Sequence, residues 1–312
     1  MRTLVLGVLT VAGLLGRARA AQAENDSQTS LLGPREIAVG EGLRGGATGS
    51  SAIGLNPSGL PLTRELVFEG GYGYRTGDSA SLVAISACDS TNVAPGCFFY
   101  DYIGSSSTLD DVPGDRSTHI AGMALSRLLV PRISIGATAK YYRFRSNVMA
   151  EEDASGFVFD VGGTIRLTDL VTVGVAAQNL LATEKTPQLP RAIGAGLHAR
   201  PIPILALGFD MRWKLEDDDH NVRYGGGAEL FLRAGSSGAI PIRAGALHDG
   251  GMDGVPGSTR TYISGGLGFA GLRWGVDVTV RHAVTGGDET LVIGSARFFG
   301  PRMASPALGG DY

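Results

Sequence analysis

Charged side chains recur at every second residue in several stretches of this sequence, and the stretch 205–214 shows the pattern most fully. Asp210, Arg212 and Lys214 alternate there with apolar residues such as Met211. Successive side chains of a β-strand point to opposite faces, so the charged residues share one face and the apolar residues share the other. Arginine forks and carboxylates on one protected face can bind oppositely charged groups of a ligand or of the same chain.

In other alternating stretches the charged residues also occupy every second position, and the whole set of these charged residues is mainly cationic. We expect these side chains to line the interior of a barrel, because a lipid-facing arginine at mid-bilayer costs roughly 2–4 kcal/mol. Two interpretations stay open: a polar pathway that favours anions, or ion pairs that fix an N-terminal segment inside the barrel. The predicted interior charges are Asp160, Arg166, Asp210, Arg212, Lys214, Arg223, Glu229, Arg233, Arg243, Arg273, Asp277 and Arg281.

Motifs for catalysis or metal binding are missing from the sequence. There is no G-x-S-x-G nucleophile elbow and no H-E-x-x-H zinc motif. The five histidines are scattered, and the acidic runs such as 216–219 lack the spacing of a calcium-binding loop. We therefore expect no enzymatic activity, no cofactor and no metal site.

The two cysteines of the chain, Cys88 and Cys97, are close in sequence. An even, closely spaced pair in an exported protein suggests a disulfide bond. Pro95 and Gly96 lie between them and could turn the chain back on itself. Two free thiols remain the alternative.

The elements that must position these residues are β-strands. From Glu65 to Phe299 the chain repeats alternating segments of about ten residues that end in turns, and we count about 14 of them, as expected for an antiparallel barrel across an outer membrane. The segment Phe98–Ile103 is the weakest, and an even number of strands depends on it. Connections alternate between short and long in the second half, which is typical of short periplasmic turns and longer external loops.

Composition narrows the class of protein. The chain has 312 residues, a net charge of -3, 18% charged residues and 48 glycines. Such a charge does not favour nucleic-acid binding, and so much glycine disfavours helices. No stretch of about 18 consecutive apolar residues is present for a membrane-spanning helix. A soluble exported β-sandwich remains an alternative to the all-β transmembrane barrel.

Four regions follow one another along the chain. Residues 1–20 have a positive start, a short apolar run and an Ala-x-Ala site, which predicts a signal peptide. Residues 21–62 are rich in small residues and are expected to form an N-terminal hatch, or plug, inside the barrel. Residues 63–300 form the predicted barrel, and residues 301–312 form a C-terminal tail. We therefore expect an outer-membrane location in a Gram-negative bacterium.

A family resemblance rests on motifs in these regions. The segment Asn56-Pro57-Ser58-Gly59-Leu60, just ahead of the first strand, resembles the Asn-Pro-Ala-Gly-Leu segment of FadL-superfamily outer-membrane proteins, with Ser58 in place of alanine. The second half resembles the PorV/PorQ-type branch in the order of its motifs, which are Gln178-Asn179, Leu189-Pro190, Gly194-Ala195-Gly196, Gly227-Ala228-Glu229 and Arg243-Ala244-Gly245.

The resemblance implies a function that the residues alone do not. A PorV-type protein would be a non-enzymatic partner or shuttle in the export or surface attachment of secreted proteins. The alternative is a FadL-like channel for hydrophobic small molecules such as fatty acids or aromatic hydrocarbons, whose hatch moves to admit them. We expect contact with outer-membrane lipid, no nucleic acid and a monomer, with either a hydrophobic ligand or a secreted protein as the partner.

Overall fold

The computed structural model describes most of the chain between residues 31 and 300. The predicted signal peptide at 1–20, the first part of the hatch segment at 21–30 and the tail at 301–312 lie outside the described residues. So do internal segments at 110–111, 148–150, 183–188, 216–221, 236–237 and 251–258.

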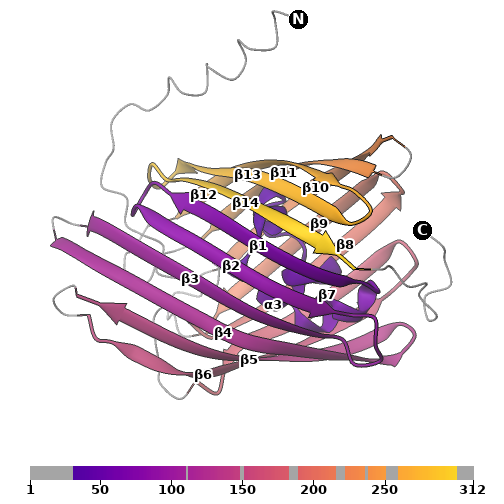
Figure 1. Ribbon diagram of the computed structural model, residues 1–312, viewed down its shortest axis with the longest axis horizontal. Coiled ribbons are helices and arrows are strands. Elements are labelled where there is room, and N and C mark those ends of the chain that lie inside the picture. Colours follow the sequence, from indigo (N-terminus) through magenta and orange to yellow (C-terminus); the bar gives the residue numbers. More distant parts are fainter. Residues whose placement is uncertain are drawn as a thin grey trace, which may run out of the picture.

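Fourteen antiparallel strands form one closed barrel, in which each strand pairs with its sequence neighbours and β1 pairs with β14 (Figure 1). This confirms the predicted fold class and excludes the soluble β-sandwich, which would need two packed sheets. The strands are β1 Leu66–Arg75, β2 Ala80–Asp89, β3 Gly96–Leu109, β4 Val112–Val130, β5 Ile133–Ser146, β6 Ala154–Arg166, β7 Val171–Leu180, β8 Ala192–Ile202, β9 Leu205–Lys214, β10 Val222–Ala234, β11 Gly238–Asp249, β12 Arg260–Ala270, β13 Trp274–Thr285 and β14 Thr290–Phe299.

The two ends of the barrel differ in their connections. Short turns such as 131–132 and 203–204 join strands at the end where β1 begins and β14 ends, which we call the turn end. Longer connections such as 181–191 and 250–259 lie at the opposite end, which we call the loop end. Outer-membrane barrels place their short turns in the periplasm.

Alternation along the strands sorts side chains between the two faces of the wall. In β13, Val276, Val278 and Val280 are exposed, whereas Asp277 and Arg281 are buried. The outward faces of the other strands repeat this pattern and form an apolar belt, as expected for a surface in contact with lipid. In the part of the chain that the structure describes, no helix is long and apolar enough to cross a membrane.

The weak third strand is present and longer than predicted. β3 continues beyond Ile103 to Leu109, where it pairs with Val112 of β4 in a hairpin at the loop end. The added part contains Ser105 and its polar neighbours, so it does not alternate between apolar and polar residues. The hydrogen bonds between paired strands join backbone groups and do not require apolar side chains. The alternation of apolar and polar residues therefore predicts a shorter hairpin than the structure contains.

The segment 31–62 lies inside the barrel, where it forms short helical turns (Figure 1). We call it the plug. Its last turn packs against β4–β6, its second turn against β7–β9, and its first turn mainly against β11–β13. The plug therefore touches most of the circumference of the wall. Its turns are α2 Pro34–Ala38, η3 Arg44–Gly46, α3 Ser50–Gly54 and η4 Pro57–Leu62.

Candidate functional site: the plugged lumen

The hatch motif forms the plug's attachment to strands β5 and β6. The Asn56 side chain caps η4 by accepting from the backbone N–H of Ser58, 3.2 Å away. Its amide donates to Thr164 Oγ1 at 3.0 Å and to the Arg44 carbonyl at 3.2 Å. The hydroxyl of Ser134 donates to the Ser58 carbonyl at 2.6 Å. Every polar atom of Asn56 is thus used inside the barrel, where an unpaired polar group would be costly.

The rest of the motif provides close packing. Gly59 approaches the Ala47 carbonyl so closely that a side chain at this position would overlap it. Pro57 lies against Gly136 of β5, where an added Cβ would also collide with the plug backbone. Leu60 is fully buried in the apolar core.

A row of glycines continues this close approach around the wall. Gly208, Gly227 and Gly245 are cross-strand neighbours on β9, β10 and β11. An added Cβ on Gly208 would overlap the carbonyl of Gly42, and one on Gly245 would overlap the backbone at Gly40. Part of the chain's high glycine content therefore lets the plug backbone lie directly on the wall backbone.

A buried ion pair holds the middle of the plug. Arg44 Nε donates to Asp210 Oδ1 over 3.0 Å, and both side chains are almost completely buried. The guanidinium also donates to the carbonyl of Leu55, which belongs to the plug itself. Removing either charged partner would leave the other buried without compensation.

Between α2 and the turn end, side chains of alternating charge contact one another in a row. Glu229 accepts from Arg35 of the plug at 2.7 Å and from Arg243 of β11 at 2.8 Å. Arg243 also binds Asp277, which accepts a further contact from Arg297 of β14. Three cations and two acids therefore share one network that joins the plug to four strands.

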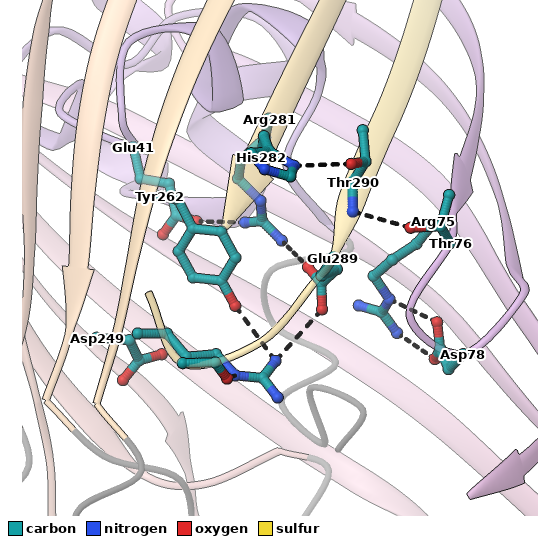
Figure 2. A network of polar contacts seen from close by, with 12 residues as sticks. Glu41, Arg75, Thr76, Asp78, Asp249, Tyr262, Arg281, His282, Glu289 and Thr290 are labelled. Carbon is teal, nitrogen blue, oxygen red and sulfur yellow. Dashed lines mark hydrogen bonds and ion pairs between the residues drawn. The ribbon is translucent and has the colours of Figure 1, made fainter. Parts of the chain in front are cut away.

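A second network joins the plug to the wall at the loop end (Figure 2). Glu41 of the plug accepts from Arg223 Nε at 3.0 Å and from Arg281 Nη1 at 3.4 Å. Glu41 has a left-handed backbone with a φ of 63°, which few residues other than glycine adopt. Arg223 also binds Asp249 at 2.7 Å, so one plug carboxylate is held between two wall arginines.

The same network extends to the last hairpin (Figure 2). Glu289 accepts from Arg281 at 3.2 Å and from Arg260 at 3.4 Å. The Arg281 guanidinium lies over the ring of Tyr262, 4.5 Å from its centre. Planar stacking and ion pairing together fix the position of this arginine.

The remaining predicted interior charges divide into two groups. Asp160 accepts from the fully buried Lys140 at 2.8 Å, and Arg212 and Lys214 are also buried. Arg166 is half-buried at the turn end.

The assignment of Arg233 and Arg273 to the interior is wrong. Arg233 is exposed at the end of β10, and Arg273 is exposed in the turn before β13 rather than on the strand. Strand parity does not determine burial at these two positions, because the wall ends there and the side chains reach solvent.

The plug also buries an acid that, among the residues the structure describes, has no cation within ion-pair distance. Glu36 of α2 accepts from the Ser51 hydroxyl and lies near Glu69 of β1. Burial, together with the negative charge of Glu69, raises the pKa of Glu36 to about 7. Among the described residues, no group of His, Cys, Asp and Glu side chains is arranged to hold a metal ion.

Cys88 and Cys97 form a disulfide bond between directly opposed residues of β2 and β3. Both are buried, and Cys97 Sγ lies 3.8 Å from the Gly49 carbonyl of the plug. The bond closes the β2–β3 hairpin near the turn end.

Opposite the charged networks, the lumen is mainly apolar. Leu82, Phe99, Ile120 and Ile293 are buried side chains of β2, β3, β4 and β14 that pack in one core with the leucines and isoleucines of the plug, such as Ile53. The interior therefore has a charged side along β9–β13 and a mainly apolar side along β2–β4 and β14, which also carries the charged residues Asp101 of β3 and Arg297 of β14. Sequence parity predicted the charged side only.

A cavity of about 40 Å³ lies within this apolar side, between the plug and the wall. The wall is thin there, because Ser295, Gly71 and Ala84 are cross-strand neighbours on β14, β1 and β2. The same three residues, with Ile85, also line an apolar groove on the outer face of the barrel. Only backbone and very small side chains separate the inner cavity from the outer groove.

The plug charges Arg35, Glu36, Glu41 and Arg44 were absent from the predicted site. They are the only Asp, Glu, Lys and Arg residues of the segment 31–62. The segment was predicted to enter a charged lumen, and it contains few charged residues of its own. Those few charges are therefore natural partners for the charges of the lumen, and their rarity could have identified them from the sequence.

No protein-family model and no curated protein matches the sequence. Solved structures nevertheless share the fold. The CymD monoaromatic hydrocarbon channel has a TM-score of 0.65 and 14% identity over 88% of this chain and 98% of its own. The Ralstonia pickettii toluene transporter TbuX has a TM-score of 0.64 and 12% identity over 87% of this chain and 98% of its own. A Pseudomonas aeruginosa FadL homologue has a TM-score of 0.58 and 11% identity over 90% of this chain and 99% of its own.

Proposed function

We propose that this protein is an outer-membrane channel for hydrophobic small molecules, of the kind that the FadL-type resemblance implies. The observation that carries the proposal is the thin wall at Gly71, Ala84 and Ser295, which borders a mainly apolar cavity on the inside and an apolar groove on the outside. A solute that partitions into lipid could pass between groove and cavity there, beside the carboxyl groups of Glu69 and Asp101 that also line the cavity.

The division of the lumen supports selectivity for apolar solutes. On the charged side, ion pairs such as Arg44–Asp210 hold the plug, and separating them would expose uncompensated charge. On the apolar side a hydrogen bond from Ser50 to Glu69 also joins plug and wall, but contacts such as those of Ile53 and Phe99 are apolar. A hydrophobic solute can replace these contacts, whereas an ion or a sugar cannot.

Other features fit an outer-membrane location. The exposed apolar belt would face lipid, and the short turns would face the periplasm. The predicted signal peptide at 1–20 would deliver the chain to that membrane. The fold of hydrocarbon and toluene channels suggests monoaromatic hydrocarbons as the first solutes to test.

An uptake experiment with a cavity-filling variant tests the proposal. Ala84→Phe would place a ring in the cavity, and Gly163→Ala of β6 is its control, because Gly163 lies outside the groove and the nearest atom to an added Cβ there is Val175 Cγ2, at 3.7 Å. Radiolabelled toluene uptake would be measured in cells that lack other hydrocarbon channels. We expect wild type and G163A to accelerate uptake and A84F to abolish the acceleration, with A84F still folded by heat-modifiable gel migration. Equal uptake with and without the wild-type protein would refute the channel.

The role as a partner in protein export stays a prediction, as does the monomeric state. A secreted partner would have to bind surface loops, and the segments 183–188, 216–221 and 251–258 lie outside the described residues. No feature of the described residues favours this role over the channel.

A further inference from the structure

The turn end of the barrel contains a vestibule of about 710 Å³ between the plug and the strand ends. Its lining carries charges of both signs and includes Arg35, Arg64, Arg243, Arg297 and Asp169. Glu65 and Glu69 come from β1 and the residues just before it, whereas Arg166, His198 and Arg200 come from β6 and β8. In the order of strands around the barrel, β7 and β8 lie about half-way round from β1, so Arg166, His198 and Arg200 lie across the vestibule from Glu65 and Glu69.

Arg166, His198 and Arg200 belong to one row of neighbouring side chains, which we call the basic row. Arg166 of β6 pairs with Thr172 of β7, which in turn pairs with His198 of β8. Directly paired residues on one face of a sheet have Cβ atoms about 5 Å apart. Arg200 follows two residues after His198 on the same strand. Two guanidinium groups, an imidazole and a hydroxyl therefore lie along one edge of the vestibule.

The strand geometry at Arg200 is specialised. The register between β8 and β9 shifts between Ala199 and Ile202, so Arg200 lies in a bulge. Bulges redirect side chains and are common next to binding sites. The Arg200 guanidinium lies over the ring of Phe231, 5.1 Å from its centre, which fixes its position at the edge of the vestibule.

The basic row differs from the other charges of the lumen in its pairing. Among the residues that the structure describes, neither Arg166 nor Arg200 has an acidic side chain within ion-pair distance, and the nearby Asp169 pairs with Arg132 instead. Among the described residues, the buried Nε of Arg200 and the buried Nε2 of His198 have no hydrogen-bond partner. The row therefore has the positive charge of two arginines and an unused donor on Arg200, and His198 Nε2 donates or accepts according to its tautomer.

The acids of the vestibule, by contrast, already have donors. Glu65 accepts from Thr63 at 3.3 Å, and Glu69 accepts from Ser50. Glu65 and Glu69 lie across the vestibule from the basic row, and Asp169, which lies beside the row, pairs with Arg132. The row can instead be neutralised by a negatively charged group that enters from the turn end.

We infer that the row of Arg166, Thr172, His198 and Arg200 is a binding site for an oxyanion, either a carboxylate or a phosphate group. The planar forks of the two arginines match such oxygens, and the unpaired Nε of Arg200 supplies a donor. Phe231, Leu170 and Pro241 border the same vestibule and can cover an apolar body attached to the anion. The site does not depend on the proposed passage of hydrophobic solutes through the thin wall.

Calorimetry on the full protein in nanodiscs of zwitterionic lipid tests this site, with empty nanodiscs subtracted. The probes are octanoate, inorganic phosphate and octanol, which has an apolar chain like that of octanoate but no charge. The variant is Arg166→Gln with Arg200→Gln, and the control is Arg233→Gln, an exposed arginine at the same end that does not line the vestibule. Heat-modifiable gel migration verifies that each variant is folded.

We expect octanoate to bind wild type and R233Q equally and to bind R166Q/R200Q at least about tenfold more weakly, because two charge-assisted forks are lost. Octanol should show no such difference, and added salt should weaken octanoate binding to wild type. Phosphate binding that depends on the two arginines would support the site with a free inorganic anion as its occupant. If neither anion binds wild type, or if both bind R166Q/R200Q as well as wild type, the oxyanion site is refuted.

Discussion

Arg44 Nε lies 3.0 Å from Asp210 Oδ1, and this contact joins the centre of the plug to the middle of β9. Neither residue is near the other in sequence, and both are almost completely buried. Because the Arg44 guanidinium also binds the Leu55 carbonyl, the pair fixes the fold of the plug as well as its position. The pair therefore helps to hold the plug from its charged side.

Replacing Arg44 by alanine is expected to loosen the plug. The change leaves the Asp210 carboxylate buried without its cation, which typically costs about 3–5 kcal/mol. The measurement is protease cleavage of the plug segment in the folded barrel, which should become much faster in R44A than in wild type.

The double variant R44A/D210A provides the control for this prediction. It removes both charges, so the plug should be more resistant to protease than in R44A alone. If R44A resists cleavage as well as wild type does, the ion pair does not hold the plug.

Gly208→Leu should displace the plug without preventing barrel formation. Any side chain at Gly208 overlaps the Gly42 carbonyl, whereas Gly70 on the outer face has open space around its Cα. We expect G208L to raise the ion conductance of the barrel in a planar bilayer and G70A to leave it unchanged. Unaltered conductance in a folded G208L protein would contradict the close approach of plug and wall.

The plug should be more stable at low pH than at neutral pH, because burial raises the pKa of Glu36 to about 7 from an ordinary value of 4.5. The folded state keeps the proton over a range in which the unfolded segment has lost it. The free energy of unfolding therefore falls as the pH rises from about 4.5 to about 7 and levels off above that range. Urea titrations of plug protection at pH 5, 6, 7 and 8 would measure this decline.

The variant Glu36→Gln isolates the group responsible. The charges that act on Glu36 most strongly are those of Glu69, Arg35 and Arg297, and all three remain in E36Q. We expect the fall in stability between pH 5 and pH 7 to be lost in this variant. A slope that persists in E36Q would mean that another group causes it.

Reduction of the Cys88–Cys97 disulfide should destabilise the barrel modestly. The closed loop is short, with a sequence separation of 9, so loop closure in the unfolded chain accounts for about 2–3 kcal/mol. Heat-modifiable migration of wild type should shift to lower temperature with reductant, whereas C88S/C97S should migrate identically with and without it. A reductant effect of equal size on both proteins would contradict this explanation.

Alternation with period two was sufficient to predict the fold, because each strand of a membrane barrel has a lipid face and a lumen face. It identified Asp277 and Arg281 as interior residues and counted the strands correctly, including the weak β3. It was wrong at Arg233 and Arg273, where the strand ends and parity no longer determines the environment.

The partners of the interior charges were not predictable from parity. Contacts such as Arg35 with Glu229 join residues nearly two hundred positions apart, and they depend on how the irregular plug folds. The thin wall at Gly71 and Ala84 was not predicted either. Small residues fit the alternating pattern as well as large ones do, but they leave empty the space that a larger side chain would fill.

Photolabelling tests the proposed passage of solutes most directly. Wild-type protein in native outer membrane would be irradiated with a photoactivatable monoaromatic hydrocarbon, and the labelled residues would be identified by mass spectrometry. The channel account predicts labels at the thin wall, on peptides that contain Gly71, Ala84 and Ser295, and their suppression by excess toluene. Labels confined to the lipid-facing belt away from these residues, with no competition by toluene, would contradict it.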